Sequence, residues 1–170
     1  MATTGFKLPG FTTYVERIKN VTAKEAAELV VKQLQEEGPA WTGEFRNNWV
    51  IVTGTGKRIN ATKESSYSFK ERKFPSAEAR KVIVAPKLKG RKSNGYTIGN
   101  IMSYRDIALD LDPDYERTTN RRQNTAPKDW YINYAEGGKL RNALQKATQR
   151  AAKNPTIKGF KGGSLATRFS

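Results

Sequence analysis

The chain of 170 residues contains no cysteine and no histidine. The absence of cysteine excludes disulfides and thiolate metal sites, and it fits a reducing compartment. The absence of histidine removes the commonest general base, the commonest metal ligand and every catalytic triad that needs an imidazole. No apolar run approaches the roughly 20 residues of a membrane-spanning helix, and the N-terminus lacks the apolar core of a signal peptide. We therefore expect a soluble protein that is not secreted.

Acidic side chains are also scarce, with 16 Asp and Glu against 31 Lys and Arg, for a formal net charge of +15. This balance favours a polyanionic partner: nucleic acid, an acidic protein or an acidic membrane surface. The charge is uneven. Residues 39–100 and 139–170 are basic, whereas residues 101–138 are slightly acidic. Two basic blocks around an acidic one suit binding to copies of the same chain as well as to DNA.

Hydrophobic spacing predicts a helix near each end of the chain. Thr22 and Glu25 form a capping box that starts the first helix, and Gly38-Pro39 ends it. Thr13 with Glu16 is a candidate start for a shorter helix before it. The C-terminal helix is predicted from an apolar stripe opposite a basic face: Leu140, Leu144, Ala147 and Ala151.

From Phe45 onward the hydrophobic pattern has a period of two, which predicts a strand covered on both sides. Phe45, Trp49 and Ile51 share one face of this strand, and Val50 and Val52 lie on the other. Two further strands are predicted, at residues 82–84 and around 96–102.

Strands flanked by helices predict an α+β fold, with an amphipathic N-terminal helix packed on a small, mostly antiparallel sheet, then a C-terminal helix. A long loop is expected at residues 103–129. We predict one structural domain over residues 1–153 and a basic, Gly-rich arm over residues 154–170.

Gly54, Gly56 and Lys57 follow a run of Val and Ile, as in many phosphate-binding loops. A Walker A motif, however, needs a hydroxyl residue after the lysine and a glycine five positions before the second one. Arg58 and Ile51 occupy those positions. We therefore interpret this stretch as a glycine turn between strands.

An acidic loop contains alternating carboxylates that suggest a calcium site: Asp110, Asp112, Asp114 and Glu116. Tyr115 stands where an EF-hand loop requires glycine, so a solvated or partner-facing loop is the default interpretation. Metal-dependent nucleases can work with Asp, Glu and Lys alone, so that class stays open. Basic segments that suit a polyanion, including DNA, contain Lys57, Arg58, Lys158 and Lys161.

The stretch Thr42-Gly43-Glu44-Phe45-Arg46-Asn47-Asn48-Trp49-Val50-Ile51, which follows the first amphipathic helix, resembles the TG-x-L-R-x-S-W signature of phage neck or tail-completion proteins. These are small subunits that join head and tail in long-tailed phages. Looser matches are residues 81–84, 98–104 and 126–130. Independently of the family, Thr42, Gly43, Phe45 and Trp49 read as fold anchors that join the first helix to the sheet.

The resemblance implies a non-enzymatic virion protein without cofactor, made in the host cytoplasm and located in the neck of the virion. It would form a homo-oligomeric ring around the DNA channel and contact head-closure or adaptor and tail-terminator proteins, with no membrane involved. The alternatives are a nucleic-acid-binding protein that acts alone and a metal-dependent nuclease.

The uneven charge suggests how neighbouring subunits of a ring would meet. We expect the acidic loop of one subunit to face a basic hairpin of the next, and the residues of that hairpin are Lys89, Arg91 and Lys92. Exposed ion pairs stabilise a contact by only about 0–1 kcal/mol each, so several pairs would be needed.

Overall fold

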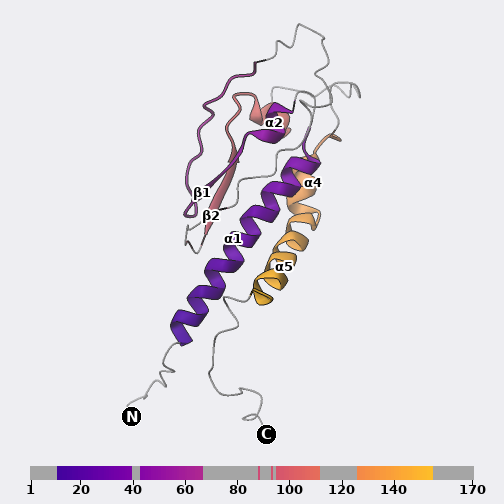
Figure 1. Cartoon of the computed structure of the whole chain (residues 1–170). Helices are drawn as coiled ribbons and strands as arrows, with labels where there is room; N and C mark the ends of the chain where they lie inside the picture. Colours follow the sequence, from indigo (N-terminus) through magenta and orange to yellow (C-terminus); the bar gives the residue numbers. More distant parts are fainter. Residues whose placement is uncertain are drawn as a thin grey trace, which may run out of the picture.

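The computed structural model describes residues 11–39, 43–66, 88, 93, 95–111 and 126–154. Its elements are, in order, α1 (Phe11–Glu37), α2 (Glu44–Asn47), β1 (Trp49–Thr53), β2 (Tyr96–Asn100), α3 (Arg105–Ala108), α4 (Trp130–Glu136) and α5 (Lys139–Ala152). Helix α1 lies between the two strands on one side and α4 and α5 on the other (Figure 1). The predicted α+β class is confirmed. None of the described helices is long and apolar enough to cross a membrane.

Helix α1 is continuous, and the prediction that a helix starts at the Thr22–Glu25 capping box is wrong. No Gly or Pro interrupts residues 11–37, so nothing forces the chain to leave the helix before Thr22. The predicted end is confirmed. The amide of Gly38 donates to the Leu34 carbonyl at 3.1 Å, and a Cβ at Gly38 would lie 2.8 Å from that oxygen.

The two strands form an antiparallel pair whose register places Trp49 opposite Asn100 and Ile51 opposite Ile98. Ile51 and Ile98 pack against the core on the side of α1. Phe45 was predicted in this strand but lies in α2, because the chain makes one helical turn before β1 begins. The predicted strand at residues 82–84 lies outside the described residues.

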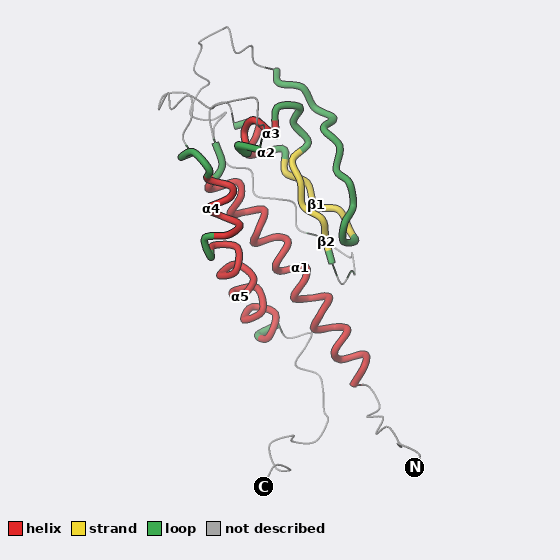
Figure 2. Tube along the Cα trace, turned by 180° about the vertical axis from the view of Figure 1, so that it is seen from behind, coloured by secondary structure: helices red, strands yellow, loops and turns green. Residues whose placement is uncertain are grey.

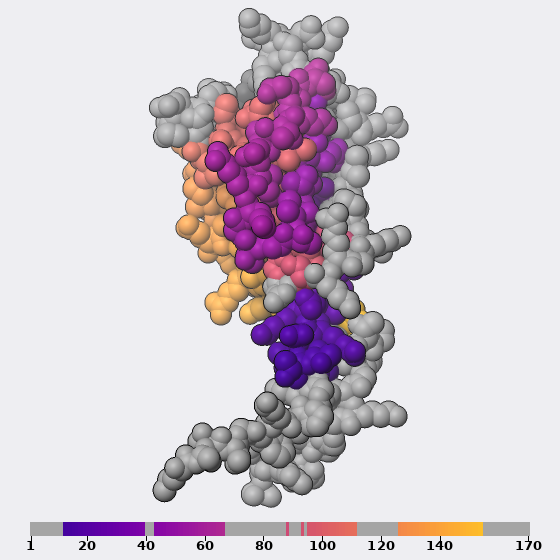
Figure 3. Space-filling view, turned by 90° about the vertical axis from the view of Figure 1, so that its left-hand side faces the viewer, coloured from indigo at the N-terminus to yellow at the C-terminus, as the bar shows by residue number. Residues whose placement is uncertain are grey.

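The chain turns at Gly54 and Gly56, where φ is 98° and 65°, and runs back along β2. Ile59 lies over Gly99, where an added Cβ would be 2.9 Å from the Ile59 Cδ1 atom. Residues 57–66, which run back along β2, are called the return segment. Residues 43–66 cover the face seen in Figure 3, and the N-terminal end of α1 extends beyond them. Gly54 and Gly56 thus form a turn as predicted, although the chain runs on as the return segment instead of pairing at once with β2.

Two sequence predictions near the end of β2 need correction. Met102 was placed in a strand, but β2 ends at Asn100 and Met102 forms an isolated parallel bridge with Lys63 of the return segment. The predicted loop at residues 103–129 contains α3 in its described part. A four-residue helix is too short for hydrophobic periodicity to reveal.

Helix α5 lies beside α1 and runs in the opposite direction (Figure 2). Its buried residues are Ala143, Ala147 and Ala151. Leu144 was predicted on this stripe but is 45% exposed. Three alanines at a spacing of four let the two helices approach closely, and that contact turns Leu144 toward solvent.

Phe45 lies at the centre of the core and is 3% exposed. Its ring makes T-shaped contacts with Trp49 at 5.6 Å and with Trp130 at 6.2 Å between centroids. The Trp130 Nε1 atom donates to the Ala108 carbonyl at 2.8 Å. One aromatic cluster therefore joins α2, β1, α3 and α4.

Candidate functional site

The stretch that resembles the phage signature forms the corner between α1 and the sheet. Gly43 precedes α2 with φ of 81°, a left-handed conformation that glycine adopts without strain. Phe45 and Trp49 are both buried in the core, as expected for anchors. Thr42, the fourth predicted anchor, lies outside the described residues.

Arg46 caps the C-terminal end of α1. Its Nε atom donates to the Gly38 carbonyl at 2.8 Å and its Nη2 atom to the Glu36 carbonyl at 3.2 Å. The last carbonyls of a helix have no partner within the helix, and a cation there also complements the helix dipole. Burial lowers the pKa of Arg46, and the Glu36 carboxylate opposes that shift. The sequence reading gave Arg46 no role.

Glu44 binds the far end of the return segment. Its carboxylate accepts hydrogen bonds from the Ser65 hydroxyl at 2.7 Å, the Ser66 amide at 2.9 Å and the Ser66 hydroxyl. Burial by itself raises the pKa of Glu44, but these bonds, together with the charge of Lys63, outweigh it and lower the pKa below 4.5. The folded protein therefore holds Glu44 in its ionised form.

The lowered pKa makes stability depend on pH. A carboxyl group whose pKa is lower in the folded state stabilises the fold fully above its ordinary value, here 4.5, and this contribution is lost as the pH falls through the lower value. We expect Glu44→Gln to melt below the parent at neutral pH, with the gap closing under acid. Thermal melts of both proteins from about pH 7 down to about pH 3 measure this. A gap that does not change with pH would contradict the assignment.

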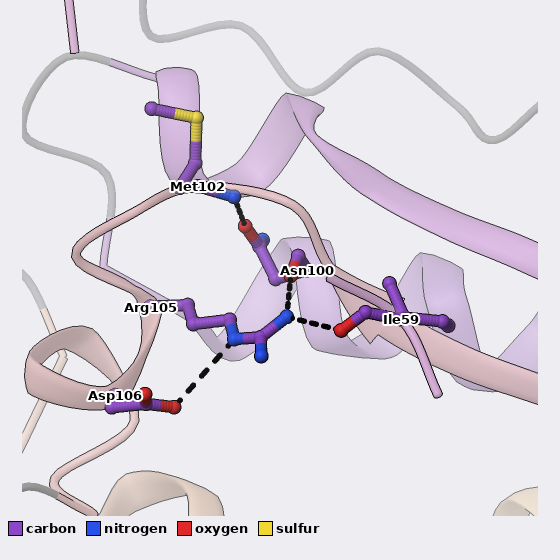
Figure 4. Close-up of polar contacts among 5 residues, drawn as sticks. All are labelled: Ile59, Asn100, Met102, Arg105 and Asp106. Atoms are coloured by element: carbon purple, nitrogen blue, oxygen red, sulfur yellow. Dashed lines mark hydrogen bonds and ion pairs between the residues drawn. The ribbon is translucent and has the colours of Figure 1, made fainter. Parts of the chain in front are cut away.

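Asn100 ends β2 and is almost fully buried, at 2% exposed. Its Nδ2 atom donates to the Phe45 carbonyl at 2.7 Å, and its Oδ1 atom accepts from the Met102 amide at 3.0 Å (Figure 4). Both partners are backbone groups, and the Phe45 carbonyl also accepts from the Asn48 amide at 3.4 Å. The side chain of Asn100 thus replaces sheet hydrogen bonds where the strand ends.

Arg105 links the return segment to the end of β2. Its Nη1 atom donates to the Ile59 carbonyl at 2.7 Å and to the Asn100 carbonyl at 3.0 Å, while Nε lies 3.6 Å from Asp106 Oδ1 (Figure 4). The polar junction is defined here as Glu44, Arg46, Asn100 and Arg105. Glu44, Asn100 and Arg105 bind segments that are distant in the sequence, whereas Arg46 joins α2 to the end of α1, the helix before it.

Asp110 belongs to the predicted acidic loop but is bound within the chain. Its Oδ2 atom accepts from the Asp129 amide at 2.8 Å, at the start of α4. Both aspartates have φ near 60°, a conformation that Asp tolerates better than most residues. The bond closes the long loop at its base.

The remaining predicted contact residues are described only in part. Lys57 and Arg58 are exposed beside the glycine turn, and the Lys57 amide donates to Thr97 Oγ1 at 3.1 Å. The others lie outside the described residues: Asp112, Asp114, Glu116, Lys89, Arg91, Lys92, Lys158 and Lys161.

The side chains of the polar junction make their contacts within the fold. Three of its four members bind backbone carbonyls or amides from other elements, and Glu44 binds Ser65 and Ser66. In the described ranges no three carboxylates lie close enough together to hold a metal ion. A scan against family models, a search of curated proteins and a search of solved structures each find no match.

Proposed function

We propose that the chain is a non-enzymatic structural subunit of a phage virion, located in the neck where the head joins the tail. The observation that carries this proposal is the role, within the fold, of the stretch that resembles the phage signature. Glu44, Phe45, Arg46 and Trp49 all serve to join α1, β1 and the return segment. The charged and aromatic side chains of this stretch hold elements of the fold together. This favours an architectural role over a catalytic one.

In this proposal copies of the chain form a ring around the DNA channel and bind a head-closure or adaptor protein on one side and a tail-terminator protein on the other. A closed ring needs two different surfaces on each subunit that fit each other. The acidic loop and the basic hairpin supply opposite charges for this purpose. Because the Asp110 carboxylate binds the Asp129 amide, charge reversal should be confined to Asp112, Asp114 and Glu116.

The proposal is tested in the phage that encodes the chain. A nonsense mutation in the gene is expected to yield filled heads and separate tails, because the neck would lack a component, and a plasmid-borne copy should restore joined particles. The parent protein should co-purify with intact virions at several copies per particle. Normal joined particles from the mutant, or a protein found only in the unassembled lysate, would overturn the proposal.

A further inference from the structure

Helix α5 carries a row of cations along one side. Lys139, Lys146, Arg150 and Lys153 follow one another at spacings of seven, four and three residues, and all four are exposed. At 100° per residue they fall within a sector of roughly 60°, and they extend for about 21 Å along the helix. This set is called the basic flank. No acidic residue occurs anywhere in residues 139–170.

Most of the basic flank has no counter-charge. Lys139 pairs with Glu37 at 2.7 Å, whereas Lys146, Arg150 and Lys153 make no ion pair in the structure as described. Like charges three and four residues apart destabilise a helix. The helix dipole favours Arg150 and Lys153 at the C-terminal end of α5, but the cations of the row still repel one another, and an anionic partner would relieve that repulsion.

The rest of α5 indicates which partner fits. Ala143, Ala147 and Ala151 bury the neighbouring side of the helix in the core, about 90° around the axis from the flank, so the flank is held on a rigid support. Asn142, Gln145 and Gln149 lie beside the flank and are exposed hydrogen-bonding groups. The exposed Leu144 points away from the flank, at about 160° from Lys146 around the helix axis.

A protein partner is usually bound through buried aromatic or apolar anchors, and the basic flank has none. A straight row of cations flanked by amides suits the regular phosphates of a duplex. We propose that the basic flank binds the backbone of double-stranded DNA without reading its sequence. This inference rests on the proposed function, because a neck ring would surround packaged DNA, and it places the contact on α5 instead of at Lys57 and Arg58.

The test is a DNA-binding titration of the full-length protein by fluorescence anisotropy, with two duplexes of unrelated sequence and a series of salt concentrations. The variant replaces Lys146, Arg150 and Lys153 by Gln. The control replaces Arg17, Lys19 and Lys24 by Gln, which removes the same net charge from α1. Circular dichroism melts show that each variant is folded.

We expect the parent to bind both duplexes equally. The flank variant should lose affinity about tenfold or more at low salt, and its log–log salt slope should become shallower by roughly 2 to 3, since each phosphate contact contributes about 0.9. The α1 control should keep most of the parent's slope. A flank variant that binds like the parent would overturn the inference, as would a control that loses as much affinity. Tighter flank-dependent binding to polyglutamate than to DNA would overturn it in favour of an acidic protein partner.

The two proposals can fail separately. Virion-associated protein whose flank variant binds DNA like the parent would leave the neck proposal standing and remove the α5 contact. Flank-dependent DNA binding by a protein that is absent from particles would remove the neck proposal, and would favour a nucleic-acid-binding protein that acts alone.

Discussion

Trp49→Ala is expected to lower the free energy of unfolding by about 3 to 5 kcal/mol, because it removes a large buried side chain and leaves a cavity. Trp49 is 7% exposed, opens β1 and meets the ring of Phe45. Loss of its ring removes the aromatic contact between α2 and the sheet. Urea unfolding followed by far-UV circular dichroism measures the change, with the slope against urea checked for constancy.

Trp49→Phe is the matched control. The Trp49 Nε1 atom is buried without a hydrogen-bond partner, so phenylalanine removes no hydrogen bond and keeps most of the aromatic contact. The expected cost is well below that of the alanine variant, because most of the ring volume is kept and the cavity is smaller. Equal stability of the alanine variant and the parent would show that Trp49 does not anchor the corner.

Asn100→Ala is expected to cost about 2 to 4 kcal/mol, because it leaves one buried backbone group without a partner and removes the shorter of two hydrogen bonds to another. The Met102 amide loses its partner, and the Phe45 carbonyl keeps only the Asn48 amide at 3.4 Å. Asn142→Ala makes the same chemical change at an exposed position of α5, where the expected effect is within about 0.5 kcal/mol. Urea titrations of both variants give the comparison. Similar small effects at both positions would mean that Asn100 does not hold the end of β2.

Local signals explain which parts of the fold the sequence predicts. Gly38-Pro39 ends α1 because this pair cannot continue a helix, and Gly54 and Gly56 turn the chain because both adopt positive φ. The α+β class follows from the switch in hydrophobic period after α1. In each case the deciding residues lie next to the feature that they determine.

The polar junction could not be predicted in the same way. Asn100 and Phe45 are 55 residues apart, and Arg105 and Ile59 are 46 apart, so no local pattern brings them together. Arg46 gave one usable signal, a cation shortly after a helix stop, where the last carbonyls of α1 need donors. The capping box at Thr22 led to a wrong prediction although it is a local signal. A local preference for a helix start has no effect where the helix already runs through that position.

The basic side of the C-terminal helix was visible in the sequence, but its meaning depended on packing. The predicted stripe included Leu144, whereas the helix buries Ala143 beside Ala147 and Ala151. The actual rotation of α5 leaves Lys146, Arg150 and Lys153 exposed on one flank. Hydrophobic size favoured leucine for the core, and close helix packing selected the smaller alanine.

The central claim is that the chain is a subunit of a phage neck, and electron cryo-microscopy of the virion neck tests that claim most directly. We predict a ring of copies of this chain on the particle axis, each with α1 between the β1–β2 pair and α5, and with Lys146, Arg150 and Lys153 facing the DNA. A neck whose density is fully accounted for by other chains, none of them with this arrangement, would contradict the account.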